Sequence, residues 1–139
     1  MTFFALGLLL QAGPVALAPS RDPIGRVSSL LVALERSDPS VETMLTSDGR
    51  GGLSFWDIGE DLNRSTLQRA MAEVSASCRV AGLQPDDMAG MTPEPSWRFV
   101  TARYWCVTRR MPHGYALRVS FLLDGDQVWA VYLPGGTPR

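Results

Sequence analysis

The pattern of apolar residues changes from helical to extended at about residue 77, and this change limits the folds open to the chain. From there on, short runs rich in β-branched and aromatic residues are separated by glycine and proline, which is typical of strands. The pattern predicts four strands, over residues 77–83, 97–109, 115–123 and 127–133. A hairpin at Asp124-Gly125-Asp126 joins the last two. Its register is open, because the loop can hold two or three residues.

The part of the chain before residue 77 predicts helices. Asp22-Pro23 is a helix start, because Asp accepts from the first free backbone N–H groups and Pro fits the first turn, and helical spacing then runs to Arg36. A shorter helix is expected to carry Val41, Met44 and Leu45. The third is expected to begin at a capping box, Ser65 to Gln68.

A short strand, residues 53–58, is expected between the second and third helices, with Asp57 near its end. The hairpin of the last two strands has an apolar face that must be covered, and the upstream helices are available to cover it. The order of elements therefore predicts an α+β fold in which N-terminal helices pack on a strongly curved antiparallel sheet.

Residues 1–18 have the pattern of a secretory signal peptide. An apolar run from Phe3 to Leu10 is followed by Gly13-Pro14 and by small residues at Ala16 and Ala18, where a signal peptidase would cut. Residues 19–139 then form a single domain. We expect this mature chain to be periplasmic or secreted, with no contact to a membrane after the signal is removed.

Cys78 and Cys106 are the two cysteines of the chain. An even pair in an exported protein favours a disulfide, and two thiols with a single histidine are too few for a structural zinc site. We expect no metal and no cofactor. The chain also has 13 arginines against 14 acids, a net charge of −1. Without an overall positive field, or an evident cluster of arginines, nucleic acid is not an expected partner.

Three segments give the chain a resemblance to the nuclear transport factor 2-like superfamily. They are residues 34–45 (LERSDPSVETML), 65–71 before the sheet, and 118–132 (RVSFLLDGDQVWAVY). The resemblance implies a cystatin-like cone, in which helices and a bent sheet enclose a pocket. The superfamily includes ketosteroid isomerases, polyketide cyclases and dehydratases as well as non-catalytic binding and dimerising domains, so the fold does not decide the function.

The resemblance to the isomerases places a general base at Asp57, beside Trp56. In an apolar environment the pKa of such a carboxyl would rise toward a useful value. In ketosteroid isomerase a tyrosine and a protonated acid donate hydrogen bonds to the developing oxyanion. The first helix, residues 23–36, contains no tyrosine, and the strand over residues 115–123 contains no acid, so both donors are missing from the places where the resemblance would put them. A base without those donors lacks a large electrostatic contribution to catalysis.

Alternation along the strand from residue 97 puts Trp97, Phe99, Arg103 and Trp105 on one face and Tyr104 on the other. We therefore predict a non-catalytic role, either binding a small apolar ligand or binding a protein, with a second copy held through the sheet face. The alternative is an isomerase, cyclase or dehydratase that uses Asp57. The pocket candidates are Trp56, Phe99, Arg103, Tyr104, Trp105 and Trp129.

Overall fold

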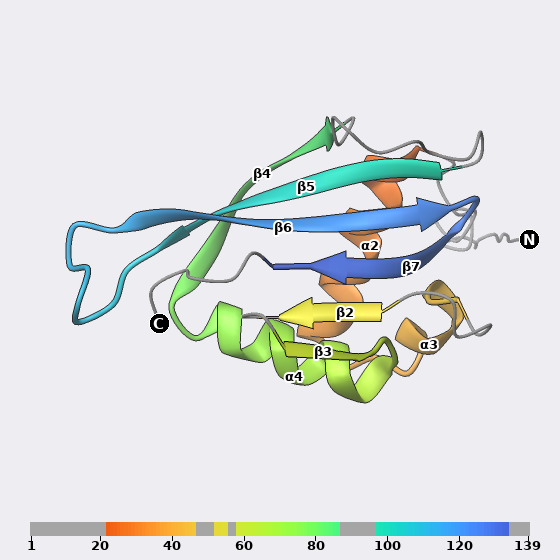
Figure 1. Ribbon diagram of the computed structural model, residues 1–139, viewed down its shortest axis with the longest axis horizontal. Coiled ribbons are helices and arrows are strands. Elements are labelled where there is room, and N and C mark those ends of the chain that lie inside the picture. Colours follow the sequence, from red (N-terminus) through yellow and green to blue (C-terminus); the bar gives the residue numbers. More distant parts are fainter. Residues whose placement is uncertain (1–21, 47–51, 56–57, 87–96, 134–139) are drawn as a thin grey trace, which may run out of the picture.

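The computed structural model describes residues 22–46, 52–55, 58–86 and 97–133. Helices precede most of the strands in the chain, and the predicted α+β fold is confirmed (Figure 1). None of the described helices is long and apolar enough to cross a membrane. The elements are α2 (Pro23–Glu35), α3 (Val41–Met44), β2 (Gly52–Phe55), β3 (Ile58–Asp61), α4 (Arg64–Ser75), β4 (Cys78–Asp86), β5 (Trp97–Cys106), β6 (Tyr115–Asp124) and β7 (Gln127–Tyr132).

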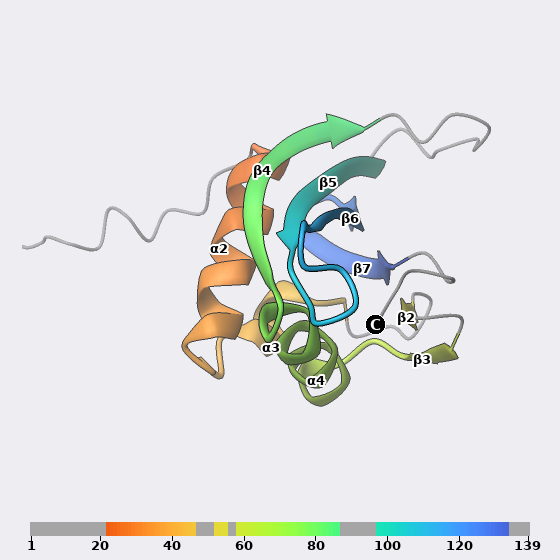
Figure 2. The same ribbon diagram turned by 90° about the vertical axis from the view of Figure 1, so that its left-hand side faces the viewer.

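The strands form one six-stranded sheet in the order β3-β2-β7-β6-β5-β4. Neighbouring strands are antiparallel, except that β2 and β7 are parallel. β5 and β6 pair along their whole length, from Trp97 opposite Asp124 to Cys106 opposite Tyr115. Figure 2 shows how strongly β4 and β5 bend. The curved sheet that the sequence predicted is therefore present.

The two faces of the sheet have different surroundings. Helix α2 crosses one face and α4 lies along its lower margin in Figure 1, and we call this the helix face. The opposite face, which these helices leave uncovered, we call the outer face. Alternate residues of the strands pack against the helices and form the main core: Leu53, Phe55, Val100, Ala102, Tyr104, Cys106, Leu117, Val119, Phe121, Leu123, Val128 and Val131.

The start of the first helix is confirmed, and that of α4 differs from the prediction. Asp22 caps α2 by accepting from the backbone N–H of Ile24 at 3.2 Å. The capping box of α4 is formed by Asn63 and Thr66, each side chain bonding the other's backbone N–H. It is not formed by Ser65 and Gln68. Gln68 instead donates to the carbonyl of Leu34 at 2.6 Å, which joins α4 to the end of α2.

The predicted single strand over residues 53–58 is wrong. Phe55 ends β2 and Ile58 begins β3, and these two residues pair with each other in an antiparallel hairpin. The prediction rests on a short aromatic run between glycines, which contains no glycine or proline of its own to mark a turn at Trp56-Asp57. Trp56 and Asp57, which make that connection, lie outside the described residues.

The open register of the last hairpin is settled by a bulge. Asp124 pairs with Gln127, so the loop has two residues, and Gly125 takes the positive φ of 64° that it requires. The register then shifts between Leu122 and Leu123, and Phe121 pairs with Val131. An inserted residue of this kind locally bends a strand.

Two other strands end away from their predicted limits. β4 continues to Asp86, past a register shift between Val80 and Gly82, and β5 ends at Cys106 instead of residue 109. Proline has no backbone N–H to donate. Pro85 is tolerated within β4 because this strand is at the edge of the sheet, where one side of the strand has no partner strand.

The predicted disulfide is present. Cys78 and Cys106 are bonded at an S–S distance of 2.01 Å and occupy directly opposite positions of β4 and β5. Both residues are buried in the core. The bond therefore fixes the end of the β4–β5 pair from which the β5–β6 connection departs.

We expect loss of the disulfide to lower the free energy of unfolding. The bond closes a loop of about 29 residues, which in the chain-entropy model contributes roughly 3.6 kcal/mol. Urea unfolding of the wild type should shift to lower midpoints when reductant is added, and a Cys78→Ala/Cys106→Ala variant should unfold at the reduced midpoint with or without reductant. A wild-type midpoint that does not respond to reductant would contradict the expectation.

Candidate functional site

The outer face is the part of the sheet on which exposed functional side chains gather. The pairing registers put its residues in cross-strand rows, starting at the end of β5 nearest the β5–β6 connection. The first row has Arg79, Trp105 and Ala116, and the second has Gly82, Arg103 and Arg118. The third has Gln84, Thr101 and Ser120, the fourth has Asp86, Phe99 and Leu122, and the last has Trp97 and Asp124. The first two rows are mostly exposed, whereas Phe99, Thr101 and Leu122 are buried.

The described pocket candidates lie on both faces of the sheet and toward both ends of β5. Phe99, Arg103 and Trp105 lie on the outer face, and Tyr104 faces the helices. Trp129 packs against Trp97, with ring centroids 5.1 Å apart, near the far end of β5 from Trp105. Trp56, like Asp57, lies outside the described residues. The strand alternation was therefore correct, but it does not by itself bring these aromatic residues together.

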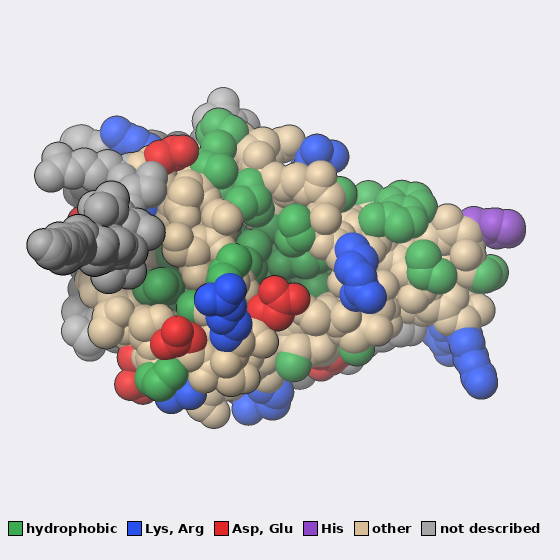
Figure 3. Space-filling model, turned by 180° about the vertical axis from the view of Figure 1, so that it is seen from behind, with side chains coloured by type: hydrophobic (Ala, Val, Ile, Leu, Met, Phe, Trp, Pro, Cys, Tyr) green, Lys and Arg blue, Asp and Glu red, His purple; other side chains and the backbone are tan. Residues whose placement is uncertain are grey.

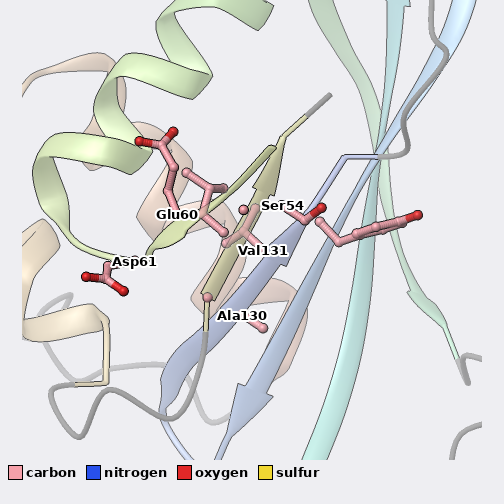
Figure 4. A pocket seen from close by; sticks show the side chains of 9 residues that line it. Ser54, Glu60, Asp61, Ala130 and Val131 are labelled. Carbon is pink, nitrogen blue, oxygen red and sulfur yellow. The ribbon is translucent and has the colours of Figure 1, made fainter. Parts of the chain in front are cut away.

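A shallow trough of about 470 Å³ lies over β3, β2 and β7 (Figure 4). Its residues include Gly52, Ser54, Gly59 and Ala130, whose small or absent side chains leave the strands open. Glu60 lies at the margin and pairs with Arg69 of α4, so its carboxylate is engaged on the helix side. The trough can accept a side chain or a small molecule. In the described chain it has no group of acids and bases arranged for proton transfer.

Two arginines face each other across strands on the outer face. Arg103 of β5 and Arg118 of β6 are directly opposite, and both are exposed. Like charges in this position destabilise a sheet. No carboxylate among the described residues forms an ion pair with either one. Gly82 of β4 makes room for Arg103, since a Cβ at that glycine would lie 2.9 Å from a guanidinium nitrogen.

Acidic residues occupy the opposite end of the same face. Asp86 lies two rows from the arginine pair and accepts from the Thr101 hydroxyl at 2.7 Å. Asp124 lies one row further on. The outer face is therefore positive toward the β5–β6 connection and negative toward the β6–β7 turn.

Tyr104 is the described residue with a strongly shifted ionisation. It lies in the core with 5% of its surface exposed, and burial raises its pKa to about 12. Its phenol therefore stays protonated at neutral pH and packs with the helices. In the described ranges there is no cluster of three His, Cys, Asp or Glu side chains that could hold a metal ion.

The chain matches no protein-family model, and no curated protein is similar to it. Solved structures that it is similar to include a ketosteroid isomerase-like protein from Erwinia carotovora atroseptica, with 17% identity over 81% of this chain and 92% of that one and a TM-score of 0.48. Another is a protein of ketosteroid isomerase-like fold from Catenulispora acidiphila, in complex with trimethylamine, with 14% identity over 83% and 86% and a TM-score of 0.47. A candidate polyketide cyclase from Xanthomonas campestris has 16% identity over 78% and 86% and a TM-score of 0.45.

The helices and the strongly curved sheet are those that the sequence resemblance implies. The chain therefore has an α+β fold with helices on one face of a strongly curved, mostly antiparallel sheet. The superfamily that the sequence resembles includes both enzymes and non-catalytic domains, so the fold does not decide the function.

We expect Tyr104 to make the protein sensitive to alkali. Between pH 10 and 12 the unfolded chain loses this phenolic proton while the folded chain keeps it, so stability falls as pH rises through that interval. The loss should approach roughly 3 kcal/mol. Urea unfolding at several pH values should show a smaller loss in Tyr104→Phe, and an unchanged one in Tyr132→Phe, whose phenol is half exposed. Identical profiles for wild type and Tyr104→Phe would contradict the expectation.

Proposed function

We propose that this protein is a non-catalytic interaction domain that binds a second copy of itself through the outer face. One observation supports the proposal above the others: an exposed arginine pair, Arg103 and Arg118, lies two rows from Asp86 on the same uncovered face. A surface with opposite charges at its two ends can complement itself when a copy is turned by 180°.

The registers define where the symmetry axis would pass. If it passes beside the partly exposed Ser120, which is paired with the buried Thr101, the exposed arginine row of one copy faces the partly exposed Asp86 of the other, and the same contact repeats on the other side of the axis. Successive rows on one face are roughly 7 Å apart, which is within the reach of an arginine side chain. Each copy would then provide a carboxylate to the arginine pair of the other copy.

The composition of the exposed part of this face is that of a protein interface. Trp105 has 50% and Tyr132 48% of its surface exposed, and both lie near the arginines. Tryptophan, tyrosine and arginine are the residues that most often dominate interface energy. The trough beside Tyr132 offers space for a side chain of the second copy.

The remaining predictions about the protein's setting are part of the same proposal. The signal peptide over residues 1–18 would direct the chain to the periplasm or out of the cell, where a disulfide is stable. The trough is open enough to hold a small apolar ligand in place of a side chain. Ligand binding there would then compete with the dimer.

Charge exchange between Arg118 and Asp86 tests the dimer. Arg118→Asp alone and Asp86→Arg alone should each weaken dimerisation at least about 100-fold, because each homodimer would place like charges together twice. An equimolar mixture of the two variants should form a heterodimer, since both of its charge contacts are attractive. Analytical ultracentrifugation of each variant and of the mixture measures these outcomes.

Arg36→Asp is the matched control, because Arg36 is an equally exposed arginine at the end of α2, away from the outer face. It should leave dimerisation unchanged. Thermal unfolding of each variant shows whether it is folded. A wild type that is monomeric at high concentration, or a mixture in which the heterodimer does not form, would contradict the proposal.

The alternative enzymatic function is supported by the position of the trough. The trough is lined by residues of β2 and β3, and the predicted base Asp57 lies between these two strands in the sequence. We expect an Asp57→Asn variant to bind a ligand in the trough unchanged, as measured by tryptophan fluorescence. If the wild type converts a carbonyl substrate and the folded Asp57→Asn variant does not, the protein is an enzyme and the proposal of a non-catalytic role is wrong.

A further inference from the structure

We propose that the connection between β5 and β6 is an arm that binds anionic phospholipid surfaces. The arm comprises residues 107–114, with two arginines, Arg109 and Arg110, at its exposed end. It is separate from the residues of the proposed dimer contact, and the inference holds for a monomer or a dimer. Its basis is the placement of charge, the projection of the segment and its ordered conformation.

Positive charge is concentrated in this part of the chain. Residues 97–123 contain five arginines, one histidine and no acid, whereas the rest of the sequence has eight arginines and 14 acids. Two of these five arginines, Arg109 and Arg110, lie in the arm itself together with the histidine, so the net charge of −1 conceals a local excess of positive charge there. Proteins use such local fields, more than net charge, to approach anionic partners.

The arm projects from the body of the protein. Figure 1 shows it extending past the helices and the other strands at the left of the view, and Figure 3 shows its histidine and arginines at the opposite edge when the molecule is seen from behind. Arg109, Arg110, Pro112 and His113 are all exposed. A flat surface can therefore meet the arm without meeting the body.

Several interactions hold the arm in one shape. The Cys78–Cys106 disulfide lies at its base, and the N–H of Val107 donates to the carbonyl of Ser77 at 2.9 Å. Thr108 and Met111 exchange backbone hydrogen bonds, so that Arg109 and Arg110 occupy the middle of a turn. An arm that is already ordered loses little conformational entropy when it binds.

A tryptophan supports the arm where it joins β6. Gly114 has a φ of 89°, and a Cβ there would lie 2.4 Å from the ring of Trp105. The N–H of Gly114 also donates to the carbonyl of Met111 at 3.0 Å, which forms a second turn. The glycine is therefore required for the close approach of the Trp105 ring to the backbone of the arm.

The chemistry of the arm fits lipid headgroups. Arginine binds phosphate with paired hydrogen bonds, and each cation near an anionic membrane adds attraction. Val107, with half of its surface exposed, provides an apolar contact beside the arginines. Cations at the end of a projecting segment can reach a flat membrane surface, and they do not need a matching acidic groove on a protein partner. This proposal replaces the expectation that the mature chain makes no membrane contact.

Vesicle co-sedimentation at low ionic strength tests the proposal. Wild-type protein should pellet with vesicles of phosphatidylglycerol and phosphatidylcholine, but not with phosphatidylcholine alone. Arg109→Gln/Arg110→Gln should weaken binding roughly 25-fold, at about five-fold for each arginine. Arg109→Lys/Arg110→Lys, which keeps both charges, should bind within a few-fold of wild type.

Arg36→Gln/Arg64→Gln is the matched control, since it removes two arginines at helix ends, the exposed Arg36 and the partly buried Arg64, and leaves the arm intact. It should bind vesicles as the wild type does, and thermal unfolding shows whether each variant is folded. Equal weakening in this control would overturn the proposal, as would equal binding to neutral vesicles. Binding to polyglutamate without binding to anionic vesicles would also overturn it, in favour of an acidic protein partner.

Discussion

The pairing of β5 with β6 is the interaction on which the other elements depend. It is continuous over the whole of both strands, and its alternate residues divide the molecule into a packed face and an open one. On the packed face, residues such as Tyr104 and Phe121 belong to the same core as the apolar sides of α2 and α4, which gives the short helices a surface to cover. On the open face the same strands display arginine, tryptophan and aspartate in fixed rows. Both the core and the candidate site therefore follow from one register.

Strand pairing also explains how charge becomes organised in a chain that is almost neutral. Arg103 and Arg118 are far apart in the sequence but directly opposite in the sheet, and Arg109 and Arg110 lie in the connection between the same strands. The acids are elsewhere, many of them in the helices, in β3 and in the turn after β6. A face with two signs of charge favours association in one orientation, and an arm with one sign favours an anionic surface.

Local sequence signals predicted what depends on local chemistry. The Asp22 cap, the strand beginnings at Trp97 and Tyr115, and the Cys78–Cys106 bond were all found in this way. The division of residues 53–58 into two strands was missed because this run contains no glycine or proline to mark the turn between them. The arginine pair was missed for a different reason: cross-strand registers set it, and no pattern within one strand reveals a neighbour's residue.

The free energy of unfolding differs between the reduced protein and the oxidised protein, in which the disulfide has formed. A newly made chain with free thiols must close the loop between Cys78 and Cys106 through non-covalent contacts alone, at a cost that the bond later removes, about 3.6 kcal/mol in the chain-entropy model. If the predicted signal peptide directs export, the precursor is at its weakest while it must remain unfolded for translocation. The chain then reaches full stability only where thiols are oxidised. The bond between β4 and β5 would in this way determine when the chain becomes stably folded as well as how stable the folded protein is.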